Sequence, residues 1–260
     1  MSNHLNKEID VLADDAPMAA IQILSCLDLT TLKGDETEEE LCGLIQASQT
    51  DYGPVASLCV YPQYVSFVAK NLPSTTTKVC TVANFPSGEN ISEATFTQIE
   101  RSLHEGAHEI DVVFPYKAFL AGEVKQVEGF VKQCRKVCNQ YVLKVILETG
   151  LFSHQPDIYK ASQMLIDQGI DFIKTSTGKV NQGATQQAVE TILSTISDFQ
   201  ASQKVGCKIS GGVRSLDQAI SYYQLIEKHF GKVWCQPQHV RFGASQLLND
   251  IINHLEKTKK

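Results

Sequence analysis

The 260-residue sequence contains no apolar run as long as the roughly 18–20 residues that a membrane-spanning helix requires. Its opening segment, MSNHLNKEIDVLADDAP, carries acidic residues and lacks the apolar core of a secretory signal peptide. The formal net charge is −6, so the sequence has no excess of basic residues such as a general nucleic-acid-binding protein has. We therefore expect a cytoplasmic protein whose partners include neither membranes nor nucleic acids.

Metal-binding cysteine patterns are absent as well. The eight cysteines form no CxxC pair and show no zinc-finger spacing. Several lie in apolar segments such as KVCTV and GCKIS, as buried reduced thiols do. Cys134 and Cys138 are four residues apart on a predicted helix, a spacing that favours core packing over redox or metal chemistry.

Eight short apolar segments recur along the chain, and each ends in polar or turn-forming residues, as buried parallel strands do. They begin at Ala20, Ala56, Lys78, Glu109, Tyr141, Asp171, Lys204 and His239. Helix-length segments separate them, and one places on a single face Val189, Ile192, Leu193 and Ile196. The alternation predicts an α/β fold with a parallel sheet, and eight strands match a (β/α)8 TIM barrel. A doubly wound open sheet is the alternative.

No low-complexity linker divides the sequence, so we expect one domain over residues 1–260. Residues 1–19 are expected to form an N-terminal helical extension. The basic end, residues 256–260, is expected to be frayed.

Charged and thiol side chains interrupt the predicted strands at Asp28, Cys59, Asp111, Lys144, Lys174 and Lys208. In a TIM barrel the carboxyl ends of the strands carry the chemistry. One buried ion pair, such as Asp111 with Lys144, has a purely structural explanation. Three lysines and two aspartates are too many for that, because each buried charge needs compensation. The set indicates a site that uses its charges.

Lysine chemistry explains why the segment DFIKTSTGK ends an apolar strand with Lys174. A lysine beside another cation in a poorly solvated site loses its proton more readily. Lowering its pKa by about 3 from the ordinary value of about 10.4 takes about 4 kcal/mol. The neutral amine can form a Schiff base with a carbonyl, while Asp111 moves protons. This argument does not choose between Lys174 and Lys208.

Three glycine-bearing loops, TSTGK, SGGVR and FGASQ, follow the last three predicted strands. TIM barrels frequently bind phosphate there, through backbone N–H groups and a helix N-terminus. The candidate phosphate contacts are Lys179, Gly211, Gly212, Arg214, Gly243 and Ser245. We expect a small carbonyl compound that carries a phosphate.

Seven segments, in this order, resemble the deoxyribose-phosphate aldolase family of class I (Schiff-base) aldolases: LDLTTL, CVYP, NFPSG, EIDVVFPY, LKVILETG, DFIKTSTGK and GCKISGGVR. The resemblance covers nearly the whole chain. It implies a carbon–carbon lyase that reversibly cleaves the phosphosugar 2-deoxy-D-ribose 5-phosphate into acetaldehyde and D-glyceraldehyde 3-phosphate, in deoxyribose catabolism. It implies no cofactor and no metal, because the protonated Schiff base is the electron sink.

The resemblance also assigns roles. Lys174 becomes the Schiff-base lysine, Lys208 the cation that lowers its pKa or donates a proton, and Asp111 a proton shuttle acting through water. Lys144 supports Asp111, and the remaining substrate-side or supporting positions are Asp28, Cys59 and Thr175. The phosphate site gains Gly178 beside the six residues named above.

The chain departs from the family pattern at several positions. Cys207 and Ile209-Ser210 replace phenylalanine and Pro-Ala, and Gln246 stands where a second serine is common. No tyrosine follows Tyr223, so a C-terminal tyrosine cannot assist proton transfer.

Alternatives stay open. The first is a different Schiff-base aldolase, and the second is a phosphosugar isomerase with Glu148 as base. A third is a barrel that binds phosphosugars without catalysis. Cys59 is either an aldehyde-reactive thiol or an inert one. The sequence does not fix the oligomeric state, and a homodimer is one possibility.

Overall fold

The computed structural model describes residues 17–73 and 76–259, and within them eight parallel strands close into a barrel. Pairing runs in the order β1-β10-β9-β8-β7-β6-β5-β4, and β1 pairs with both β10 and β4. This closure confirms the TIM barrel and excludes the doubly wound sheet. The barrel strands are β1 (Leu27–Thr30), β4 (Ser57–Val60), β5 (Lys78–Ala83), β6 (Glu109–Val113), β7 (Val142–Ile146), β8 (Phe172–Lys174), β9 (Gly206–Ser210) and β10 (Val240–Ala244).

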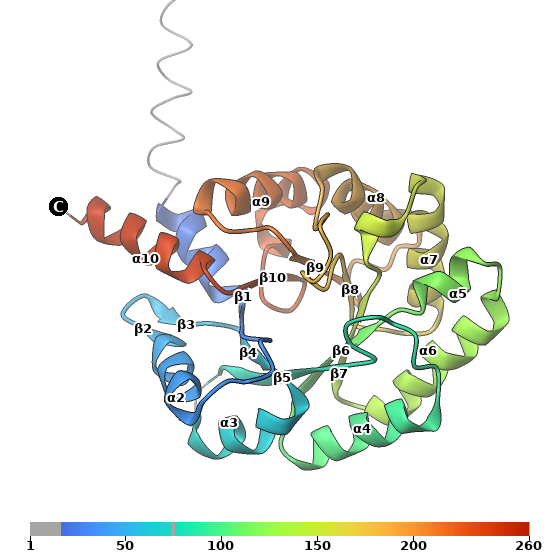
Figure 1. Cartoon of the computed structure of the whole chain (residues 1–260). Coiled ribbons are helices and arrows are strands. Elements are labelled where there is room, and N and C mark those ends of the chain that lie inside the picture. The colour runs from blue at the N-terminus through green and yellow to red at the C-terminus, as the bar shows by residue number, and fades with distance from the viewer. Residues whose placement is uncertain (1–16, 74–75, 260) are drawn as a thin grey trace, which may run out of the picture.

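Helices surround the barrel, and Figure 1 shows them as a ring around the strands. They include α2 (Glu38–Ala47), α3 (Val65–Asn71), α4 (Glu93–His104), α5 (Tyr116–Leu120), α6 (Val124–Cys138), α7 (Gln155–Asp167), α8 (Gln186–Asp198), α9 (Leu216–Phe230) and α10 (Leu247–Thr258). Short strands β2 (Gln49–Thr50) and β3 (Gly53–Pro54) form a separate antiparallel pair. None of the helices in the described part of the chain is both long and apolar enough to cross a membrane.

Capping boxes start two of the helices that follow barrel strands. At α2 the Thr37 hydroxyl accepts the N–H of Glu40, and the Glu40 carboxylate accepts the N–H of Thr37. Ser215 and Gln218 repeat this exchange at α9. Each box satisfies two backbone donors that helix geometry leaves free. The boxes thereby fix the ends of the β1–α2 and β9–α9 loops.

Strand register gathers charged side chains inside the barrel. Asp111 pairs with Lys144 across β6 and β7, and Lys174 pairs with Lys208 across β8 and β9. Because side chains alternate along a strand, Glu109 shares the inner face of β6 with Asp111. The residues between and after them, Ile110 and Val112, face the helices and are buried.

One sequence prediction needs correction near the start of the barrel. The apolar run from Ala20 is helical over residues 17–25 and becomes strand β1 only at Leu27, because Ala20, Ile23 and Leu24 have helical spacing and are buried together. At the other end α10 continues to Thr258, and Leu255 packs into the core, while fraying of residues 256–260 stays a prediction. The expected helix over residues 1–19 falls mostly on residues 1–16, which lie outside the described part.

Candidate active site

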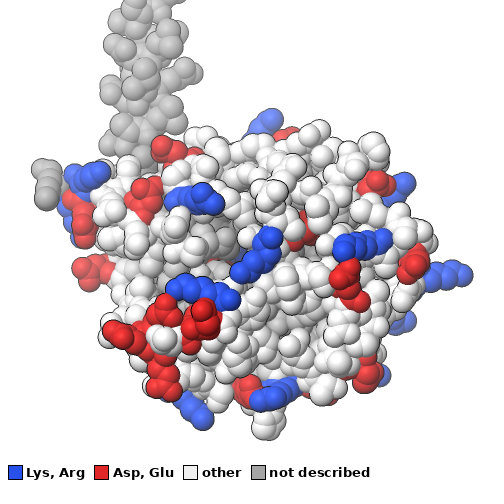
Figure 2. Space-filling view, viewed as in Figure 1, with Lys and Arg blue, Asp and Glu red and all other residues white. Residues whose placement is uncertain are grey.

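A cavity of about 530 Å³ opens at the carboxyl ends of β1, β8, β9 and β10. All seven residues predicted to bind phosphate line it, namely Gly178, Lys179, Gly211, Gly212, Arg214, Gly243 and Ser245. Among the described lining residues none is acidic, and four are basic, namely Lys33, Lys174, Lys179 and Arg214. Figure 2 shows basic groups near the middle of this face and most acidic groups nearer its edge. The cavity therefore favours an anionic ligand.

The β9–α9 loop needs glycine to form this wall. Gly211 and Gly212 have φ angles of 82° and 89°, in the left-handed region that favours glycine. A Cβ atom on Gly211 would also lie 3.0 Å from the Cα atom of Gly183 and from the Cβ atom of Ser176. Glycine at these positions therefore lets the backbone of the loop approach a ligand closely.

Lys174, the last residue of β8, connects the cavity to the barrel interior. Its side chain lines the cavity, and its ammonium group donates a hydrogen bond to Asp111 Oδ2 at 2.7 Å. Burial alone would raise the pKa of Asp111, but the three lysine ammonium groups around it lower this pKa well below its usual range. Asp111 is therefore an anion that touches the candidate nucleophile.

Lys208 lies deeper than Lys174 and is fully buried. Its ammonium group contacts Asp28 Oδ2 at 2.5 Å and Asp111 Oδ2 at 2.8 Å. Burial opposes its positive charge, but the two carboxylates outweigh burial and raise the pKa of Lys208. Lys208 is thus a fixed cation that shares one carboxylate oxygen with Lys174.

Lys144 is fully buried too, and it contacts three carboxylates. Its ammonium nitrogen lies 2.5 Å from Glu109, 3.0 Å from Asp111 and 3.5 Å from Asp28. These contacts overcome burial and raise the pKa of Lys144. The sequence had predicted its link to Asp111, and the structure adds the other two.

Sequence reasoning missed Glu109 and Arg241, which complete the network at its base. The Arg241 guanidinium contacts Asp28 Oδ1 at 2.7 Å and the two Glu109 oxygens at 2.8 Å and 2.9 Å. Despite burial, Lys144 and Arg241 lower the pKa of Glu109. Strand alternation could have found both residues, because Glu109 lies two positions before Asp111 and Arg241 two before Gly243.

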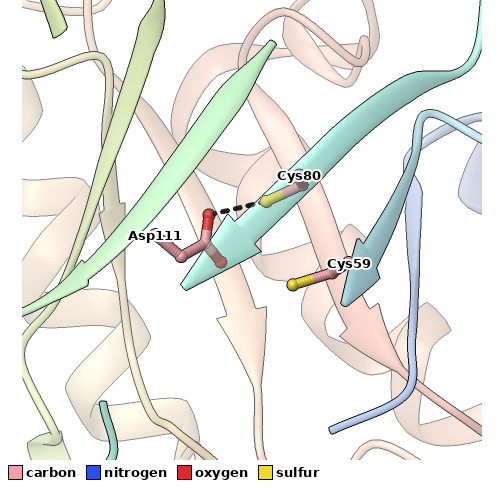
Figure 3. A group of neighbouring side chains, drawn as sticks. All are labelled: Cys59, Cys80 and Asp111. Atoms are coloured by element: carbon pink, nitrogen blue, oxygen red, sulfur yellow. Dashed lines mark hydrogen bonds between the residues drawn. The ribbon is translucent and has the colours of Figure 1, made fainter. Parts of the chain in front are cut away.

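Cys59 and Cys80 extend the interior group toward β4 and β5, where they are paired in register. Figure 3 shows the Cys80 sulfur directed at Asp111, and it donates to Asp111 Oδ1 at 3.2 Å. The ligand atoms of these three residues lie within 4.8 Å of one another, a spacing that a metal ion could use. Lysine ammonium groups already surround Asp111, and their charge opposes a cation. Burial raises the pKa of Cys80, so its neutral thiol serves as a hydrogen-bond donor instead.

Four predicted substrate-side or supporting residues, Asp28, Cys59, Lys144 and Thr175, do not line the cavity. Each is fully buried and is therefore surrounded by other protein groups rather than by the cavity. Thr175 exchanges hydrogen bonds with the backbone of Ser210 at 3.0 Å and 3.1 Å, which ties β8 to β9. Asp111 is fully buried and does not line the cavity either, so any influence of these residues on a ligand is indirect.

Glu148, the candidate base of an isomerase, is engaged in a local hydrogen-bond cluster. Its carboxylate accepts the N–H of Thr177 at 3.2 Å and also the Thr177 hydroxyl. Burial raises the pKa of Glu148. The contacts fix the start of the β8–α8 loop, and Glu148 itself does not line the cavity.

Two residues at the cavity belong to the departures from the family pattern, and a third was not predicted. Ser210 lines the cavity, but its hydroxyl donates to the Ser176 carbonyl at 2.5 Å. Gln246, in the place of a serine, lines it as well. Lys33, in the loop after β1, was not singled out from the sequence, because a single lysine in a loop carries no pattern.

The family model of the DeoC/LacD family aldolases matches residues 22–250, which include every residue of this site. The chain belongs to the DeoC/LacD aldolase family. This membership confirms the resemblance seen in the sequence and supports an aldolase function, that of a lyase.

Solved structures agree with this family at the level of the fold. A putative deoxyribose-phosphate aldolase from Toxoplasma gondii ME49 is similar with a TM-score of 0.83 at 22% identity, covering 93% of this chain and 97% of that one. One from Coccidioides immitis has a TM-score of 0.79 at 24% identity, with 98% of each chain covered. The deoxyribose phosphate aldolase from Aeropyrum pernix, described as tetrameric, has a TM-score of 0.68 at 26% identity, covering 95% of this chain and 98% of that one.

Proposed function

We propose that this aldolase reversibly cleaves 2-deoxy-D-ribose 5-phosphate into acetaldehyde and D-glyceraldehyde 3-phosphate through a Schiff base on Lys174. One observation carries the proposal. Of the three interior lysines, Lys174 alone lines the cavity, whereas Lys144 and Lys208 are fully buried and each contacts at least two carboxylates. A substrate carbonyl can therefore reach Lys174 and not the other two.

Charge balance in the interior favours the same residue. The network contains three acidic groups (Asp28, Glu109 and Asp111) and four basic groups (Lys144, Lys174, Lys208 and Arg241). One basic group is therefore in excess. Lys174 has a single carboxylate contact, which it shares with Lys208, and is the least compensated of the three lysines.

The steps follow from these positions. The neutral Lys174 amine attacks the aldehyde carbon C1 of the open-chain sugar, and loss of water gives an iminium ion. A base removes the proton of the C3 hydroxyl, the C2–C3 bond breaks, and its electron pair moves to the iminium to give an enamine and glyceraldehyde 3-phosphate. Protonation at C2 and hydrolysis then release acetaldehyde and restore the amine. In this proposal Asp111 moves protons through water, and its distance of 2.7 Å from the Lys174 nitrogen supports that role.

The other end of the cavity supports a phosphorylated substrate. The loops after β8, β9 and β10 offer glycine backbone, the Ser245 hydroxyl and the cations Lys179 and Arg214. Backbone donors and fixed cations of this kind bind phosphate. The names of the similar structures favour deoxyribose 5-phosphate among phosphorylated carbonyl compounds. The eight free thiols fit a reducing compartment, and we place the reaction in the cytoplasm.

Borohydride trapping tests this proposal. The protein is incubated with 2-deoxyribose 5-phosphate and sodium borohydride, and the modified peptide is mapped by mass spectrometry. We expect a reduced adduct on Lys174 and none in Lys174→Ala, which should retain the fold by circular dichroism and lose turnover. An adduct on Lys208 instead would refute the assignment of roles.

The trapping experiment and a Glu148 variant together separate the alternatives. Tight binding of the phosphosugar without any adduct would favour a non-catalytic binding barrel. An isomerase that uses Glu148 as base would lose about 10²–10⁴-fold in rate on Glu148→Gln, because that is the usual contribution of a general base. The proposed aldolase should lose less than this in the variant, since Glu148 does not line the cavity and acts on it only through its contacts with Thr177.

A further inference from the structure

Lys33 is a cation of the cavity that the reaction described above does not use. It lies in the loop between β1 and α2 and lines the cavity together with Thr30, Thr31 and Leu32. Its ammonium group lies 2.7 Å from Glu40 Oε1, and 62% of its side chain is exposed. The loop therefore holds a positive charge at the rim, on the opposite side of β10 from the glycine loop after β9.

The loop that carries Lys33 is held in place by a buried carboxylate. Glu36 accepts the N–H of Lys33 at 2.8 Å, the N–H of Gly34 at 2.9 Å and the Thr31 hydroxyl at 2.9 Å. Burial alone would raise the pKa of Glu36, but these hydrogen bonds lower it, so Glu36 is an anion that organises the loop. The backbone of Lys33 thus has one defined position.

A second contact joins this loop to the predicted phosphate site. The Lys179 ammonium group, from the loop after β8, donates to the Leu32 carbonyl at 2.5 Å. The residue next to Lys33 is therefore in direct contact with a candidate phosphate-binding cation. Glu40 is fixed as well, because its other carboxylate oxygen belongs to the capping box of α2.

We propose that Lys33 is a substrate-binding residue that exchanges Glu40 for the phosphate group and makes the site selective for phosphorylated sugars. The exchange costs little, because an exposed lysine–glutamate pair in water contributes little stability. A phosphate dianion offers more charge and three acceptor oxygens, and charge-assisted hydrogen bonds to it are stronger. The inference takes the identity of the sugar from the proposed function, but binding of the anion can be measured without turnover.

A matched pair of variants tests this role. Lys33→Met removes the cation at the rim, and Lys117→Met removes a similar lysine that does not line the cavity. Lys117 contacts Glu89 at 2.5 Å with 61% of its side chain exposed, so the two lysines differ mainly in their position. Binding of inorganic phosphate is measured by isothermal titration calorimetry, and kcat/KM is measured for 2-deoxyribose with and without its 5-phosphate.

We expect Lys33→Met to weaken phosphate binding and to lower kcat/KM for the phosphorylated sugar by about tenfold or more, as for a lost hydrogen bond between charged groups. For Lys33→Met, kcat/KM for unphosphorylated deoxyribose should stay within about twofold of wild type. For Lys117→Met, phosphate binding and kcat/KM for both sugars should also stay within about twofold, since an exposed pair contributes little. Glu40→Gln, which preserves the capping box, should tighten phosphate binding by freeing Lys33.

The outcomes separate the two proposals. If Lys33→Met binds inorganic phosphate as tightly as Lys117→Met does, the role of Lys33 is refuted, whatever the enzyme's substrate. An equal loss of kcat/KM for both sugars would also refute it, because the effect would then be structural. If the wild-type protein turns over neither sugar, the proposed aldolase reaction fails, while the calorimetric comparison still decides whether Lys33 binds phosphate.

Discussion

Replacing Arg241 by methionine should destabilise the barrel far more than the same change at an exposed arginine. The Arg241 side chain is 8% exposed and contacts Asp28 Oδ1 at 2.7 Å and Glu109 Oε1 at 2.8 Å. Removing one partner from a buried ion pair typically costs about 3–5 kcal/mol. Without Arg241, Asp28 and Glu109 keep only their contacts with Lys144 and Lys208. We expect a loss of this size in the free energy of unfolding.

Arg101→Met is the matched control, since Arg101 contacts Glu105 at the same distance of 2.7 Å but its side chain is 76% exposed. An exposed i,i+4 pair contributes about 0.3–0.5 kcal/mol. The two arginines therefore differ in burial rather than in the length of the contact. Urea unfolding followed by circular dichroism, with both variants compared at one pH, measures the difference.

A double-mutant cycle with Glu109→Gln locates the cause of the loss. If the penalty of Arg241→Met comes from the carboxylate oxygens that lose their guanidinium donor, the double variant should lose less than the sum of the two single variants. Equal losses for Arg241→Met and Arg101→Met would refute the reasoning, as would an additive cycle.

Two further predictions concern acid stability and the loop after β9. The pKa values of Asp28 and Asp111 are lowered, despite burial, by nearby cations. Such groups stabilise the fold above their unfolded pKa of about 3.9 and lose this contribution as the pH falls through the folded pKa, so their contribution to the melting temperature should be unchanged down to about pH 5 and should be lost progressively below about pH 4. Gly183→Ala should raise KM for the phosphosugar in steady-state assays, because its Cβ would lie 2.1 Å from the Gly211 carbonyl oxygen, whereas Gly129→Ala, with open space in α6, should leave KM unchanged.

Strand alternation and family resemblance were sufficient to predict the barrel and the cavity wall. The seven apolar segments from Ala56 onward correspond to seven barrel strands, and all seven expected phosphate residues line one cavity. These features are local, because each depends on a strand end and the loop directly after it. The helix at residues 17–25 was missed because one apolar run contained both a helical and a strand pattern.

The network below the cavity was harder to predict, because it depends on closure of the barrel. Arg241 on β10 meets Glu109 on β6, although 132 positions separate them in the sequence and no strand pairing joins them. Their contact crosses the interior, and only the radius and tilt of the closed barrel bring them together. Alternation alone places both side chains inside but gives no partner for either.

The same interior contacts distinguish two lysines that the sequence left equivalent. Lys174 and Lys208 are paired in register on neighbouring strands, and both contact Asp111 Oδ2. Lys208 is two residues before the end of β9, where Asp28 can reach it from β1, whereas Lys174 is the last residue of β8 and meets the cavity. The earlier end of β8 thus gives Lys174 an opening to substrate, whereas Lys208 has a second carboxylate. On this argument, adding a carboxylate next to Lys174 should impair Schiff-base formation even if the cavity keeps its shape, because the Lys174 nitrogen would then have two carboxylate contacts, as that of Lys208 has.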